Sequence, residues 1–154
     1  MLTKIANFFS AHIANPMAQE QDPGHALQAA TVVLLVEMMQ VDGDVNPQEQ
    51  AALQQIVHQH FSLSEQETAE LVAFAETELQ DAACAQYFTR RLNELLSQQD
   101  KILLIRYLWQ IAYADGRLDK YEEHYVRQIA ELLYVSHTAY IKMKLEVEQE
   151  IQAP

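Results

Sequence analysis

Residues 109–123 read WQIAYADGRLDKYEE. Apolar residues run up to an Asp-Gly pair, and charged residues at helical spacing follow it. This pattern predicts an apolar helix, a tight turn at the glycine and a second, amphipathic helix. The same pattern occurs upstream in residues 37–49, which read EMMQVDGDVNPQE.

An offset of 73 positions relates the two stretches, placing Asp42 on Asp115 and Gly43 on Gly116. Further pairs follow in the same register: Val45 with Leu118, Asn46 with Asp119, Glu49 with Glu122, Leu53 with Val126, Ile56 with Ile129 and Phe61 with Tyr134. We interpret this as an internal duplication of a helix-turn-helix unit.

The composition favours a helical protein with an acidic surface. The 154 residues are 49 % hydrophobic and include only three glycines and four prolines, which favours helices over strings of turns. A net charge of −12 repels phosphate backbones, so we expect no nucleic-acid partner. Cys84 is the single cysteine, which excludes an intrachain disulfide and a cysteine-cluster zinc site and fits a cytoplasmic location.

Helical periodicity covers most of the chain, and no segment alternates as a strand does. We predict an all-α bundle of seven to eight helices built from two pseudo-symmetric helix-turn-helix units. The expected helices cover residues 2–13, 26–41, 47–60, 64–79, 83–96, 102–114, 120–133 and 136–151. Residues 26–41 and 102–114 are apolar on nearly all sides, so we expect both to be buried at the centre.

The first 24 residues are expected to lie outside this unit. Leu2, Ile5, Ala6, Phe9 and Ile13 form one apolar helix face, and residues 15–24 form a loop or linker. We expect this helix to dock on the protein's own core; the alternative is a membrane surface, for which it lacks a basic face. We therefore divide the chain into residues 1–24 and a helical domain over 25–154. No transmembrane span or secretory signal is expected.

Most residues of the repeated turn have a structural explanation. Gly43 and Gly116 can end a helix in the left-handed conformation. Asn46 and Asp119 are good N-caps, and Glu49 and Glu122 stand where a carboxylate completes a capping box.

Asp42 and Asp115 are not explained by turn chemistry. Each ends a helix, where the dipole disfavours a carboxylate by about 0.3–1 kcal/mol. A nearby Arg or Lys, backbone N–H groups or a bound cation would compensate. Oxygen ligands suit Ca²⁺ or Mg²⁺, and the candidate ligands are Asp42, Asp44, Asn46 and Glu49 in the first turn and Asp115, Asp119 and Glu122 in the second. The spacing is not that of an EF-hand, because Pro47 occupies the glycine position. Capping alone and a true metal site both stay open.

Glu37 interrupts the first buried helix, and a carboxylate there needs a partner. Arg106 lies on the equivalent second helix, so one interpretation is a Glu37–Arg106 ion pair. The other is that Glu37 reaches the surface.

With these residues in hand, the chain resembles the TerB-like family, named after tellurite-resistance proteins, and in particular its small stand-alone bacterial branch. The similarity lies in residues 41–43 with Glu49 and in residues 108–116 with 121–124, and it extends over residues 25–151. The resemblance implies an all-α bundle with duplicated acidic units. It also implies a divalent-cation role for Asp42, Glu49, Asp115 and Glu122. Arg117 departs from the family pattern, and its charge could neutralise the site in place of a metal.

Three functions follow from these observations. The first is a non-catalytic cytoplasmic module of a stress-response or tellurite-resistance system, which acts through an unknown protein partner and binds a divalent cation at the acidic turns. The second is a purely structural adaptor without metal. The third is a metal-dependent enzyme, for which the sequence offers no nucleophile or base beside the carboxylates.

Overall fold

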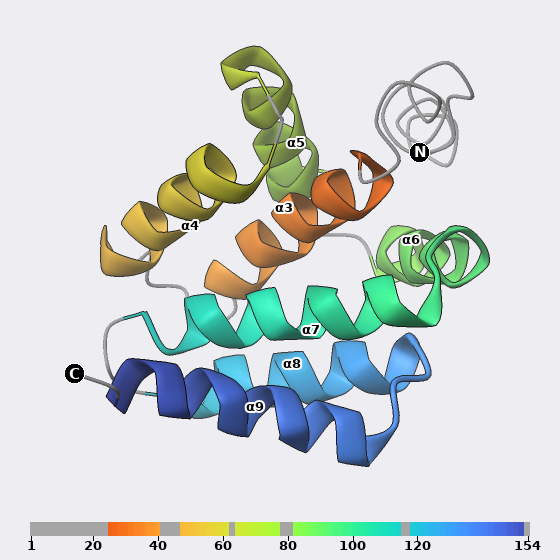
Figure 1. Cartoon of the computed structure of the whole chain (residues 1–154). Helices are drawn as coiled ribbons and strands as arrows, with labels where there is room; N and C mark the ends of the chain where they lie inside the picture. Colours follow the sequence, from red (N-terminus) through yellow and green to blue (C-terminus); the bar gives the residue numbers. More distant parts are fainter. Residues whose placement is uncertain (1–24, 41–46, 62–63, 78–81, 115–117, 153–154) are drawn as a thin grey trace.

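The computed structural model describes residues 25–40, 47–61, 64–77, 82–114 and 118–152. Seven helices and no strand occur within these ranges, which confirms the all-α bundle (Figure 1). The helices are α3 (His25–Met39), α4 (Pro47–His60), α5 (Glu65–Thr77), α6 (Ala82–Leu95), α7 (Gln98–Ala112), α8 (Lys120–Leu132) and α9 (His137–Gln152). The predicted helix over residues 2–13 and its linker lie outside the described residues. No described helix has both the length and the apolarity needed to cross a membrane.

The helix bounds follow the offset that the sequence predicts. Helices α3 and α7 begin at residues 25 and 98 and end at residues 39 and 112, so both ends differ by 73. Helices α4 and α8 begin 73 positions apart, at residues 47 and 120. The same offset brings α5 over α9, and α5 packs on α3 as α9 packs on α7.

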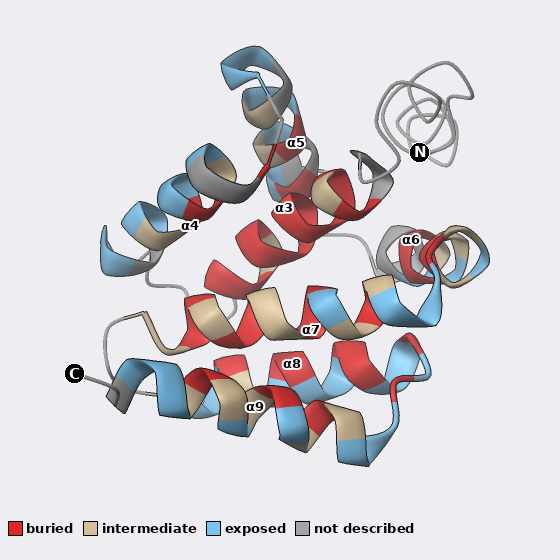
Figure 2. Cartoon of the chain, viewed as in Figure 1, coloured by how far each residue is buried: buried red, intermediate tan, exposed pale blue. Residues whose placement is uncertain are grey.

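Helix α3 lies at the centre of the bundle (Figure 1). It packs against α4 and α5 on one side and against α7 and α8 on the other. Helices α7, α8 and α9 pack against one another beyond it. Nearly every described side chain of α3 is buried, as its lack of a polar face predicts (Figure 2).

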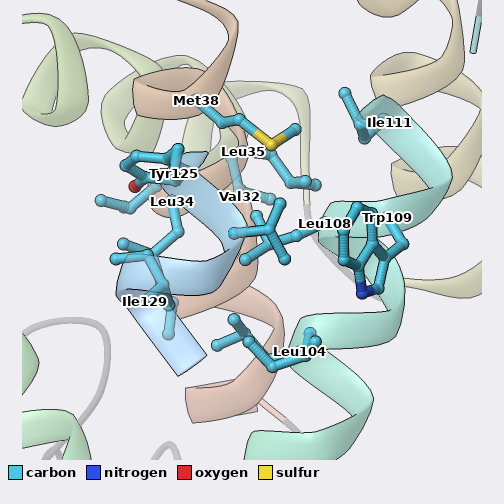
Figure 3. Packing of buried hydrophobic residues seen from close by; sticks show 14 of the residues in the cluster. Val32, Leu34, Leu35, Met38, Leu104, Leu108, Trp109, Ile111, Tyr125 and Ile129 are labelled. Atoms are coloured by element: carbon cyan, nitrogen blue, oxygen red, sulfur yellow. The ribbon is translucent and has the colours of Figure 1, made fainter. Parts of the chain in front are cut away.

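Large side chains from α3, α7 and α8 meet in the core (Figure 3). Trp109 is fully buried, and its indole N–H donates to the backbone oxygen of Tyr140 at 3.3 Å. Its ring lies 5.2 Å from that of Tyr140, which fixes α9 against α7. Thr31, a polar residue inside α3, is buried because its hydroxyl donates to the Leu27 carbonyl at 2.7 Å.

Helix α7 begins four residues earlier than the predicted start at residue 102. Ser97 is its N-cap, and the Ser97 side chain accepts a hydrogen bond from the Asp100 backbone N–H at 3.1 Å. The apolar pattern on which the predicted start rests begins one turn inside the helix, so it does not indicate the polar first turn. At the α8–α9 turn, Ser136 caps α9 as expected and accepts from the Ala139 N–H at 3.1 Å.

Candidate functional site: the acidic turns and the Glu37–Tyr125 pair

The helix ends that flank the two acidic turns lie on one side of the molecule. Helix α3 ends and α4 begins there, and on the same side α7 ends and α8 begins (Figure 1, left). Asp42, Asp44, Asn46 and Asp115, together with the Glu49 side chain, lie outside the described residues. Within the described residues, no group of three or more His, Cys, Asp or Glu side chains could hold a metal ion.

Asp119 is the N-cap of α8, as predicted. It has extended backbone angles, φ −75° and ψ 136°, and its side chain precedes the first helical turn. Its Oδ1 accepts hydrogen bonds from the backbone N–H groups of Tyr121 at 2.7 Å and Glu122 at 3.3 Å. This geometry satisfies two of the N–H groups that a helix start leaves without an intrahelical partner.

Glu122 lies in the first turn of α8, three residues after Asp119. It is buried, with 2 % of its surface exposed. It lies on the inner side of α8, one turn before Tyr125 and Val126, which are also buried. The positive end of the helix dipole favours a carboxylate at this position. The second acidic turn therefore places a carboxylate inside the protein.

Glu37 and Tyr125 form a hydrogen-bonded pair between α3 and α8. The Tyr125 hydroxyl donates to Glu37 Oε2 at 2.7 Å. Burial raises the pKa of Glu37, and the hydrogen bond from Tyr125 opposes that effect. Burial also raises the pKa of Tyr125, and the neighbouring Glu37 charge adds to the increase. The raised pKa keeps the Tyr125 hydroxyl a neutral donor to Glu37 at neutral pH.

The predicted Glu37–Arg106 ion pair is wrong. Arg106 turns toward α9, where its guanidinium lies 2.9 Å from Glu146 Oε2 and also pairs with Glu150. Glu146 and Glu150 are one turn apart, so one guanidinium reaches both carboxylates. Arg106 is on the side of α7 that packs on α9, whereas Glu37 faces α8. The alternative, a Glu37 that simply reaches the surface, does not describe the residue either, because it is only partly exposed and accepts from Tyr125.

A second hydrogen bond ties α9 to the end of α7 beside the second acidic turn. The Tyr113 hydroxyl donates to Glu148 Oε1. Burial, followed by the hydrogen bond and negative charge of Glu148, raises the pKa of Tyr113 well above its ordinary value. The hydroxyl partners of Tyr113 and Tyr125 lie on helices distant in the sequence, so no local sequence pattern indicates them.

A cleft of about 620 Å³ lies on the side of the bundle where α4 begins and α7 ends. Most of its lining is amide or aliphatic, as in Gln48, Ala51, Gln110 and Ala114. Its acidic residue Glu150 pairs with Arg106. The described lining thus offers hydrogen-bonding groups near the start of α4 and the end of α7.

An all-α helical bundle is the class of protein that this fold defines. The family model described as Tellurite resistance protein TerB matches residues 28–145. The chain therefore belongs to the TerB family. No curated protein and no solved structure matches the chain significantly.

Proposed function

We propose that this TerB-family chain is a non-catalytic, cytoplasmic module of a stress-response or tellurite-resistance system, and that it acts through protein contacts. The observation that carries the proposal is Tyr134, at the turn between α8 and α9. Its side chain is 78 % exposed, and its backbone has a φ of 58°.

A tyrosine is an unfavourable residue for this backbone position. The Tyr134 N–H donates to the Glu131 oxygen at 3.1 Å and the Val135 N–H to the Ala130 oxygen at 2.8 Å, a helix end that glycine usually occupies. The left-handed conformation costs a residue with a Cβ roughly 1–2 kcal/mol. A largely exposed ring contributes little packing to offset that cost, which supports a role outside the fold.

The turn that carries Tyr134 is held in place by α6 and α7. Asn93 donates from its amide to the Leu132 oxygen at 2.7 Å, and Gln98 to the Tyr134 oxygen at 3.4 Å. The Leu132 side chain is exposed beside it. An aromatic side chain on a fixed turn loses little conformational entropy on binding, and tyrosine is enriched among residues that dominate interface energies.

A pull-down from the source organism tests this proposal. The immobilised chain is compared with Tyr134→Ala and with Tyr121→Ala, which removes another exposed tyrosine, at 54 % exposure, from the start of α8. We expect a partner that the wild type and Tyr121→Ala retain and that Tyr134→Ala loses. Equal retention by all three chains would exclude Tyr134 as the contact.

We also propose that the acidic turns bind a divalent cation, Ca²⁺ or Mg²⁺. The buried Glu122 carboxylate, the neighbouring Asp119 and the position of the flanking helix ends on one side of the bundle support this. Calorimetry with Ca²⁺, Mg²⁺, Mn²⁺ and Zn²⁺ should give heat with the wild type and less with the double variant Asp42→Asn/Asp115→Asn. No heat and no thermal stabilisation by any ion would leave capping as the role of the turns.

Arg117 distinguishes the two roles further. If its charge replaces a metal, Arg117→Gln should increase cation affinity. If the turns only cap helices, Asp115→Asn should keep or raise stability, because the unfavourable interaction with the α7 dipole disappears.

A further inference from the structure

The two halves of the bundle differ in how their second and third helices meet. Helix α8 packs against α9, whereas the equivalent α4 and α5 diverge above α3 (Figure 1). A groove of about 560 Å³ lies between α4 and α5. Its apolar lining comes from Leu53 and Val57 on α4 and from Ala69, Val72 and Ala73 on α5.

The α5 wall of the groove has the length of one short helix. Its α5 wall runs from Glu65 to Glu76, which is about 17 Å at a rise of 1.5 Å per residue. Ala69 and Ala73 are exposed on this wall, and such small side chains permit close approach of another helix. Thr68 Oγ1 is buried at the same wall and has no hydrogen-bond partner among the described residues. The two walls of the groove therefore supply no hydrogen-bond partner for this hydroxyl group.

We infer that residues 2–13 of this chain dock in the α4–α5 groove as an amphipathic helix. Their apolar face consists of Leu2, Ile5, Ala6, Phe9 and Ile13. A helix over these residues is also about 17 Å long, which matches the α5 wall.

The charges on the two surfaces are complementary. Residues 1–19 contain no Asp or Glu, although the whole chain has a net charge of −12, and they carry Lys4. The groove presents exposed Glu65 and Glu76 at opposite ends of its α5 wall. A positively charged segment is therefore attracted to this groove, whereas the rest of the acidic chain is repelled from it.

The tether between the segment and the fold is long enough. Residues 14–24 join the segment to His25, where α3 begins, and extended residues span up to about 3.3 Å each, or about 36 Å in total. Helix α3 has 15 residues and is about 22 Å long. Both α4 and α5 pack on α3, so a segment tethered to its first residue reaches the groove between them.

A spin label on the polar side of the segment tests this placement in the full-length chain. The label is attached to Ala11→Cys after Cys84→Ser, and loss of amide peak intensity is recorded by NMR. We expect the largest losses at the groove residues of α4 and α5. Phe9→Asp should remove these losses, whereas the control Asn7→Asp, which adds the same charge on the opposite side of the helix, should leave them unchanged.

Three results would overturn the inference. The first is an absence of intensity loss at the groove. The second is a loss concentrated on α8 and α9, the equivalent pair in the other half. The third is a loss seen only when spin-labelled chains are mixed with isotope-labelled chains that carry no spin label, which would make the occupant a second copy.

Discussion

The hydroxyl of Tyr125 donates a 2.7 Å hydrogen bond to Glu37, 88 residues earlier in the chain. This bond gives a carboxylate on the most buried helix of the bundle a donor from α8. A charged hydrogen bond in such a place is worth more than an exposed one, and losing its donor leaves the carboxylate poorly solvated.

Replacing Tyr125 by Phe should therefore lower the free energy of unfolding by about 1–3 kcal/mol, measured by urea denaturation. The same substitution in a Glu37→Leu background should cost less, because no carboxylate then lacks its donor. Equal losses in the two backgrounds would show that the residues are not coupled.

Stability should depend on pH through Glu37. Its pKa is raised above 4.5 in the folded protein, so the folded state keeps a proton that the unfolded state has released. The stabilising contribution is thus fully present below about 4.5 and is lost as the pH rises through the raised folded value. Relative to Glu37→Gln, the wild type should gain stability as the pH falls from neutral through the raised pKa of Glu37 toward 4.5. Parallel stability curves for the two proteins would contradict this.

Asp119→Ala should reduce the free energy of unfolding by about 1 kcal/mol, because α8 loses its N-cap. Asp119→Asn should keep most of that stability, since asparagine caps equally well. Ser136→Ala, which removes the cap of α9, provides a comparison of similar size. If Asp119→Asn were as destabilising as Asp119→Ala, the carboxylate charge would have a role besides capping.

Tyr134→Gly should raise stability by roughly 0.5–1 kcal/mol, because glycine adopts a positive φ without strain but loses more entropy on folding. Tyr134→Ala keeps the backbone strain and should give no such gain. Thermal unfolding of both variants provides the measurement. An equal gain for alanine would mean that the exposed ring, and not the backbone, is unfavourable.

Arg106→Gln should cost about 0.5–1 kcal/mol, and the loss should shrink at high salt, because both carboxylate partners are exposed. Arg127→Gln is the matched control. Its single pair with Glu131 has side chains 65 % and 70 % exposed, and its removal should have no measurable effect. A larger loss for Arg127→Gln than for Arg106→Gln would show that the Arg106 ion pairs are not the more stabilising ones.

Periodicity and capping chemistry predicted the described helices and the Asp119 cap because both are encoded within a few adjacent residues. The start of α7 was also encoded, in Ser97 and Asp100, but the polar residues of its first turn do not continue the apolar pattern of the helix. Glu37 was correctly expected to need a partner. The identity of that partner depends on how α3 and α8 are rotated about their axes, which packing decides.

The divergence of α4 and α5 also lay beyond sequence reasoning. Positions related by the 73-residue offset, such as Val72 and Leu145, are both apolar, and nothing in either residue distinguishes a closed helix pair from an open one. Only the packing around α3 reveals that one pair leaves a groove. The metal ligands stay a prediction, because most of them lie outside the described residues.

Helix α3 is covered on one side by α7, which follows it by more than fifty residues. In a nascent chain synthesised only as far as Ser97, the apolar side chains of α3 that α7 covers would therefore be exposed to water. We therefore expect the core around α3 to form only after α7 has been synthesised.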